Sequence, residues 1–340
     1  MNYSFIIPNR LVWIDWAKVI AISFVVFGHI PQEPGSFPQS YIVTFHMPLF
    51  FFISGYLTKK EFFCKATLKK YWHTLIIPYF CYNIIFYPYW VVRHMVDCPQ
   101  AGWFDFVKPL IGTVMLQCES PYSESLNGVT WFIVSLLGYK IILSICNKYK
   151  YGTLFMTLLA ILTAIAYIVN EFYLYTKDLP HIGFMKCLSF FYLGHLFKQK
   201  GIISESHNSK DWYSCIGWLS ISLICYYIPD PMNNILLYAF WFWTISLCGT
   251  LGILSFCRLL TSIHSKIIDN ISIGTIVIMG LHFMLIGTTN FVLEKILDID
   301  RIIYHWVIAL LIVLLIEGLL YPIILLFKEK APFMLGKIKK

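Results

Sequence analysis

Charged side chains are scarce in this sequence. Only 13% of its 340 residues are Asp, Glu, Lys or Arg, whereas 58% are hydrophobic. A soluble globular domain is about one quarter charged, so this chain has too little charge to coat a surface in water. Disorder is excluded by 28 Phe, 22 Tyr and 11 Trp, because disordered chains are poor in aromatic residues. The net charge of +8 does not indicate nucleic-acid binding, because Lys and Arg lie in short clusters between apolar runs.

The common motifs of soluble enzymes and metal sites are also missing. The sequence contains no P-loop, GxGxxG, G-x-S-x-G or H-E-x-x-H pattern. Its ten cysteines form no C-x-x-C or Cys/His pair with ligand spacing. We therefore expect no metal and no permanently bound cofactor. The first apolar run carries Asp15 and Lys18 and has no small-residue cleavage site after it, so we also expect no cleavable signal peptide.

What the sequence does contain is a series of long apolar runs. A membrane-spanning helix needs about 20 mostly apolar residues, and ten segments meet this need: 11–30, 41–57, 73–92, 129–147, 152–170, 181–197, 213–228, 234–257, 271–293 and 304–327. These runs lack the alternation of barrel strands. The sequence predicts an all-α, polytopic transmembrane helix bundle that forms a single domain over residues 1–340.

Proline and charge refine this picture. Pro78 and Pro88 predict kinks in the third span, the eighth span could be tilted or broken, and 104–116 reads as a re-entrant or interfacial segment. With the N terminus inside, the inner segments hold eighteen Lys and Arg and the outer segments five. The positive-inside rule then predicts that both termini are cytoplasmic in a multi-pass protein of the cell membrane.

Ionisable residues inside spans are the strongest functional candidates, because a charge at mid-membrane costs about 2.5–3.5 kcal/mol. In the first span, Lys18 and His29 differ by about 20° from three full helical turns, and Asp15 and His29 by about 40° from four. Asp15, Lys18 and His29 therefore line one face, with Ile22 and Val25 between them. Asp15 and Lys18 could instead form an ion pair that only orients the helix, and His29 could simply meet headgroups or water.

Other spans carry further candidates. His46 follows His29 after a short loop and should lie close to it, although it could be a packing residue beside Pro48. His282 falls near the middle of the ninth span, and Glu317 lies deep in the tenth with a partner that we cannot name. Trp131 opens the fourth span, where an aromatic-belt position is the alternative. Weaker candidates are Lys140, His181, Lys186 and His195.

One cysteine pair is a candidate disulfide. Cys98 and Cys118 share the longest predicted outer loop, where a bridge can form if the compartment is oxidising. The other eight cysteines lie in or near spans or inner loops, where they act as small hydrophobic residues.

Four segments resemble a known family. Arg10 to His29 resembles an opening signature R-x-x-x-I-D-x-x-K…V-V-x-G-H, in which Lys18 and His29 have the family's spacing of a basic residue and a histidine. The others are FHMPLFFFISGYL from Phe45, the Trp131-Phe132 pair, and SIGTIVIMGLH, which ends at His282. Together they resemble the membrane acyltransferase-3 family over roughly residues 10–327, and within it the sugar O-acetyltransferases related to fucose 4-O-acetylases.

The resemblance implies an enzyme that uses cytoplasmic acetyl-CoA to acetylate a sugar hydroxyl of a cell-surface polysaccharide or of its lipid-linked precursor. It makes His29 the essential histidine. The expected roles are catalytic for His29, Lys18 and Asp15, substrate-binding for His46, Trp131 and His282, and donor phosphate-binding for Lys69 and Lys70. Two departures stand out: Lys69-Lys70-Tyr71-Trp72-His73 replaces the Arg-rich stretch usual before Pro78-Tyr79, and no esterase-like domain follows the helices.

Several alternatives stay open. His29 could act as a general base or carry the acetyl group itself, and Lys18 or His46 could stabilise the oxyanion or position the donor. The lysines before the third span could serve membrane orientation alone. A transporter or flippase for a glycan or small solute is the main alternative function, although the paired broken helices of transporters are not apparent. A regulatory or scaffold protein without activity is the third. The expected partners are acetyl-CoA, the glycan acceptor and membrane lipid, with no nucleic acid.

Overall fold

The protein is almost entirely helical. The computed structural model describes residues 11–116, 119–120, 123–124, 126–171, 182–203, 210–228 and 234–337. Within these ranges the only strands are β1 (Glu119–Ser120) and β2 (Ser123–Glu124), which pair as an antiparallel hairpin. Arg10, Cys118 and His181 lie outside the described residues. Cys98 is an exposed free thiol, and its bridge to Cys118 stays a prediction.

All ten predicted spans fall on helices, which confirms the all-α bundle. The helices are α1 (Val12–His29), α2 (Gln39–Leu57), α3 (Lys65–Tyr71), α4 (Ile77–Asp97), α5 (Trp103–Val114), α6 (Trp131–Cys146), α7 (Gly152–Val169), α8 (Ile182–Gln199), α9 (Lys210–Tyr227), α10 (Ile235–Leu259), α11 (Lys266–Ile273), α12 (Thr275–Leu297) and α13 (Trp306–Lys330). In the described ranges, eight helical segments are long and apolar enough to cross a membrane. Helices α8 and α9 are more polar and fall short, so a total of ten crossings stays a prediction.

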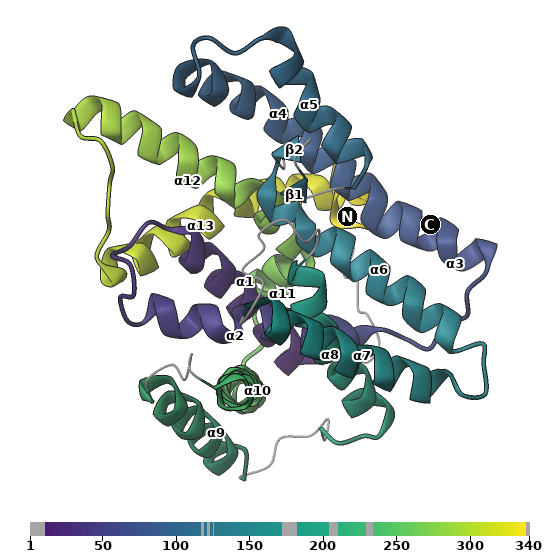
Figure 1. The fold of residues 1–340 in the computed structure, drawn as a ribbon. Coiled ribbons are helices and arrows are strands. Elements are labelled where there is room, and N and C mark those ends of the chain that lie inside the picture. Colours follow the sequence, from purple (N-terminus) through teal and green to yellow (C-terminus); the bar gives the residue numbers. More distant parts are fainter. Residues whose placement is uncertain are drawn as a thin grey trace.

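Helices α1 and α2 lie at the centre of the bundle. Figure 1 shows them between α12 and α13 on one side and α7 and α8 on the other, with α9 packed beside α10. The aromatic run of α2 forms the core: Phe45, Phe51 and Phe52 are almost completely buried. The ring of Phe51 lies 4.6 Å from that of Phe132 at the start of α6. The segment from Phe45 to Leu57, which resembles the family, thus forms the core against which neighbouring helices pack.

Two glycines allow α2 and α8 to approach closely. A Cβ at Gly55 would lie 1.8 Å from the carbonyl oxygen of Phe191, and one at Gly194 would lie 2.0 Å from that of Phe52. Backbones meet this closely only where small residues face each other, as is common between membrane helices. The pair holds α8 against α2 and sets the position of the polar residues that α8 carries.

The helices are interrupted at two informative places. A π-helical turn, Trp72–Ile76, joins α3 to α4 immediately before Pro78, which cannot donate to the carbonyl of Thr74. The ninth predicted span is divided into α11 and α12 at Gly274, where a Cβ would lie 2.5 Å from the side chain of Ile324. By contrast α10 runs unbroken from Ile235 to Leu259. The interruption that we allowed for in the eighth span therefore occurs in the ninth.

The segment expected to be re-entrant or interfacial forms α5. This helix lies along α4 and is tied to it by hydrogen bonds from Tyr79 Oη to the carbonyl of Thr113 (3.0 Å) and from Tyr87 Oη to that of Phe106 (2.9 Å). Trp103 and Val114 remain 77% and 70% exposed at its two ends. A short helix that leaves large apolar side chains uncovered suits a position at the membrane surface.

The α2–α8 contact predicts the effect of one added methyl group. Gly194→Ala should destabilise the protein by about 1–3 kcal/mol, because neither backbone can yield without opening the contact. Gly217→Ala is the matched control, since a Cβ at Gly217 would meet no atom within 4 Å. Thermal unfolding in detergent measures both, and equal midpoints would show that the close contact does not limit packing.

The charge distribution predicts the orientation of the bundle. A reporter placed within residues 58–64 or fused after Lys340 should report the cytoplasm, and one placed within 97–102 the outer side, because the basic segments stay inside. Activity of an enzyme that works only in the cytoplasm, measured at 97–102, would contradict the proposed topology.

Candidate active site

The polar face of α1 is directed at the last three helices. Asp15 and Lys18 contact Ser272 of α11, Ser23 contacts Glu317 of α13, and the ring of His29 lies beside the ring of His282 of α12. The helical periodicity of the sequence predicts a common face for Asp15, Lys18 and His29, and their contacts agree with it. In a membrane, such groups are stable only when other helices provide their partners.

At one end of this face, Asp15 and Lys18 converge on the same residue. The hydroxyl of Ser272 donates to the Asp15 carboxylate, and Lys18 Nζ donates to the carbonyl oxygen of Ser272 at 2.7 Å. That carbonyl lies at the C-terminal end of α11, where the break at Gly274 removes the usual helical donors. A cation also suits the negative end of the helix dipole. Lys18 and Asp15 thus hold the C-terminal end of α11, next to the break at Gly274, against α1.

Beside this face, about 140° around the helix from Lys18, Ser23 makes a contact that the sequence did not reveal. Ser23 Oγ donates to Glu317 Oε1 at 2.6 Å, so the partner of Glu317 is a hydroxyl rather than a lysine or histidine. Glu317 is only 6% exposed. The available signal was Ser23 itself, the one hydroxyl within the apolar run of the first span.

Two histidine rings meet at the other end. The ring centroids of His29 and His282 are 5.2 Å apart, and that of Phe283 lies 5.5 Å from His29. A positive charge on His46 would be repelled by a charge on His29 or on Lys186. His29 is exposed, His46 is half-buried and His282 is fully buried. Of the predicted site residues, the structure therefore brings the rings of His29 and His282 together.

The tautomers of two of these rings follow from their contacts. Nδ1 of His282 lies 2.8 Å from the carbonyl oxygen of Ile278, and Nδ1 of His46 lies 3.0 Å from that of Val43. A carbonyl oxygen can only accept a hydrogen bond, so each neutral ring carries its proton on Nδ1. Each therefore presents Nε2 as an acceptor, which is the form that can take a proton or orient a donor.

Side-chain amides hold the helix end that bears His29. Gln39 Nε2 donates to the carbonyls of Gly28 and Ile30, both at 3.0 Å, and Gln32 Nε2 donates to that of Phe27 at 3.3 Å. These carbonyls lie at the end of α1, where helical partners run out. Both glutamines were missed in the sequence, although Gln32 is a polar residue in the short loop after His29 and Gln39 is the first residue of α2.

Trp131 and the two lysines have other partners than the histidines. The ring of Trp131 packs 5.8 Å from that of Phe51, and Gly183 of α8 lies against it. Lys69 and Lys70 are exposed on α3, where Lys70 forms an ion pair with Glu61. Burial raises the pKa of the Glu61 carboxyl, but hydrogen bonds from Lys70 and Tyr71 outweigh it and hold that pKa below its usual value. Lys70 is thus partly neutralised.

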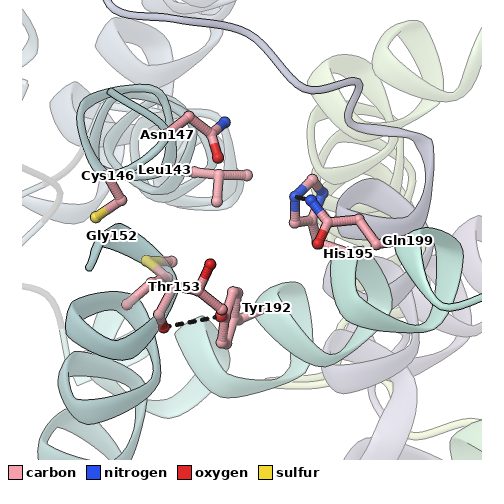
Figure 2. Close-up of a pocket in the computed structure, with 9 residues that line it drawn as sticks. Leu143, Cys146, Asn147, Gly152, Thr153, Tyr192, His195 and Gln199 are labelled. Carbon is pink, nitrogen blue, oxygen red and sulfur yellow. Dashed lines mark hydrogen bonds between the residues drawn. The ribbon is translucent and has the colours of Figure 1, made fainter. Parts of the chain in front are cut away.

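A small pocket near these lysines does not hold the chemistry. It lies between the ends of α6, α7 and α8 (Figure 2) and encloses about 10 Å³, room for about one water molecule. His195 on its wall is fully bonded: Nδ1 donates to the Thr58 carbonyl at 3.2 Å, and Nε2 accepts from Gln199 at 2.8 Å. A packing role fits His195 best. Among the described residues, no group of three or more potential ligands is placed to hold a metal ion.

The Asp15–Ser272 contact gives a prediction about stability. Ser272→Ala should lower the free energy of unfolding by about 1–3 kcal/mol, because the buried Asp15 carboxylate loses a donor. Ser54→Ala is the control, since its hydroxyl bonds only to the Phe50 carbonyl of its own helix. Thermal unfolding should separate the two variants, and adding Asp15→Asn to Ser272→Ala should cost less than the two changes summed. Strict additivity would argue against the contact.

Comparison with known proteins agrees with this geometry. The model of the acyltransferase-3 family, described as an acyltransferase domain, matches residues 11–327. No curated protein and no solved structure matches the chain. The family match spans nearly the whole sequence, including the polar face of α1 and the helices that it contacts. The chain therefore belongs to the acyltransferase-3 family and is a multi-pass membrane acyltransferase.

Proposed function

We propose that this acyltransferase moves an acetyl group from acetyl-CoA to a sugar hydroxyl of a cell-surface polysaccharide or of its lipid-linked precursor. The observation that carries the proposal is His29, an exposed imidazole at the end of an otherwise partnered polar helix face. The donor and acceptor classes rest on the resemblance of the α1 signature to sugar O-acetyltransferases. The family match favours this enzyme over a transporter.

His29 is suited to act as the general base. A sugar hydroxyl is a poor nucleophile at neutral pH, so an imidazole that takes its proton during attack lowers the barrier, typically by a factor of about 10²–10⁴. The new C–O bond forms at the thioester carbonyl, and the C–S bond then breaks. The proton on His29 passes to the departing CoA thiolate. An acetyl-histidine formed on His29 is the alternative route.

Distance along α1 separates the roles of His29 and Lys18. Eleven residues of helix span about 16 Å, so the two side chains cannot touch the same carbonyl group. This favours donor positioning for Lys18 over stabilisation of the oxyanion, because a long donor can contact Lys18 and still present its thioester to His29. His46 would stabilise the developing negative charge only when protonated, because its neutral ring presents Nε2 as an acceptor.

The lysines on α3 suit a weak, screened attraction of the CoA phosphates. Lys69 is exposed, whereas Lys70 would have to release Glu61 before it could bind a phosphate. In the proposed topology these lysines face the cytoplasm, where acetyl-CoA is found. The enzyme would be a multi-pass protein of the cell membrane with both termini inside and no permanently bound cofactor.

The proposal predicts that His29→Ala abolishes acetyl transfer. The loss should exceed about 10²-fold for a general base, while expression and insertion stay normal because the exposed ring contributes little to packing. The measurement is transfer of labelled acetyl from acetyl-CoA into the glycan fraction of membranes with matched protein levels. Retention of label on wild-type protein without acceptor would select the acetyl-histidine route.

His264→Ala is the matched control, because His264 is exposed in the loop between α10 and α11. It should transfer acetyl at the wild-type rate. Normal transfer by His29→Ala would overturn the mechanism, and no transfer by wild-type membranes supplied with acetyl-CoA and glycan would overturn the proposed donor or acceptor.

A further inference from the structure

His282 carries an unexplained buried nitrogen. The residue is fully buried near the middle of α12, and its Nε2 has no hydrogen-bond partner. An unpartnered polar atom in the interior costs about 1–3 kcal/mol, so it calls for an explanation. Nδ1 is bonded back to the carbonyl of Ile278. Nε2 is therefore on the ring edge that points away from the backbone of α12.

The neighbour of this ring is His29. The two centroids are 5.2 Å apart and the planes are inclined by 46°. At this separation a modest rotation brings a nitrogen of His29 within hydrogen-bond distance of the His282 ring. Such contacts in catalytic sites are often long before substrate binds and shorten in the complex. The Phe283 ring meets His29 edge-on at 5.5 Å and limits the directions in which it can turn.

The position of His282 is fixed by a separate set of contacts. Asn127 Nδ2 donates to the carbonyl of Gly280 at 2.9 Å, two residues before His282. Thr130 Oγ1 donates to the carbonyl of Asn127 at 2.8 Å and so supports it. A Cβ at Gly280 would lie 2.3 Å from the ring of Tyr82, so α12 cannot slide past α4 here. The free nitrogen is thus held in place before any substrate arrives.

We propose that His282 is the positioning residue for His29: its Nε2 accepts a hydrogen bond from one ring N–H of His29 in the enzyme–substrate complex. This inference rests on the proposed role of His29 as a base. Because Nε2 of His282 can only accept, it fixes the His29 tautomer and leaves the other His29 nitrogen with a free lone pair. The same bond then stabilises the imidazolium that forms when His29 takes the hydroxyl proton.

The proton balance closes without a charge on His282. His29 gains the proton of the sugar hydroxyl as the C–O bond forms and gives it to the CoA thiolate as the C–S bond breaks. His282 begins and ends the cycle neutral, with its proton on Nδ1. Direct contact of His282 with substrate is not needed, which fits a ring that is completely buried.

Two amide substitutions separate this role from packing. In His282→Gln the side-chain amide extends to the position of Nε2, so its oxygen can still accept a hydrogen bond from His29. In His282→Asn the shorter amide extends only to the position of Nδ1, so this hydrogen bond is lost. We expect His282→Asn to lower kcat by about 10- to 100-fold, the range for losing a hydrogen bond to a charged group. His282→Gln should retain most of kcat, and both should leave the KM for acetyl-CoA unchanged. A packing role would weaken both variants alike in thermal stability and leave their kcat values equal.

A second measurement does not depend on acetyl transfer. Diethyl pyrocarbonate modifies neutral imidazoles. The folded membrane protein is treated with the reagent and then digested, and mass spectrometry of the peptides gives the rate of modification at His29. This rate should fall in His282→Asn and be retained in His282→Gln, with modification of exposed His264 as the internal standard. Equal rates and equal kcat in both variants would overturn the role of His282. If the wild-type protein transfers no acetyl group, the proposed function fails. The modification rates then still test whether His282 forms a hydrogen bond with His29.

Discussion

The structure depends on one constraint: polar groups on a helix inside a membrane need partners from other helices. Helix α1 carries Asp15, Lys18 and His29 on one face and Ser23 to the side of it, and each meets a residue of α11, α12 or α13. Satisfying these groups draws the C-terminal helices against the first helix, although more than 250 residues separate them in sequence. The same contacts that allow α1 to remain in the bundle also assemble the candidate site.

The sequence predicted those features that depend on local periodicity. Apolar runs located the helices, and the 3.6-residue repeat placed Asp15, Lys18 and His29 on one face. The pairing of Lys18 with Ser272 and of Ser23 with Glu317 could not be predicted, because periodicity fixes a face but not which distant helix covers it. At the break, Gly274 leaves room for the side chain of Ile324, which is also a tertiary contact. Sequence patterns likewise could not show that Trp131 packs on Phe51.

The site combines an exposed base with buried supports. His29 is exposed, whereas His282 is fully buried and Asp15 is 7% exposed. This division suits an enzyme whose base must meet a water-soluble or headgroup-level acceptor while its supports keep one geometry. Gln39 adds to it by capping the two carbonyls on either side of His29. The close contact of Gly55 and Gly194 holds α2, which carries His46, against α8.

An exposed base raises a problem of selectivity, because water is also a nucleophile. A base that is free to activate any hydroxyl would hydrolyse the thioester and waste the donor. Transfer is favoured only when the acceptor hydroxyl is held against His29, since correct positioning can be worth effective concentrations of about 10⁵ M or more. The acceptor must then cover the open face of His29 and displace the water there. In the proposed mechanism the protein supplies the base and its orientation, and a bound sugar acceptor would complete the water-excluding wall of the site.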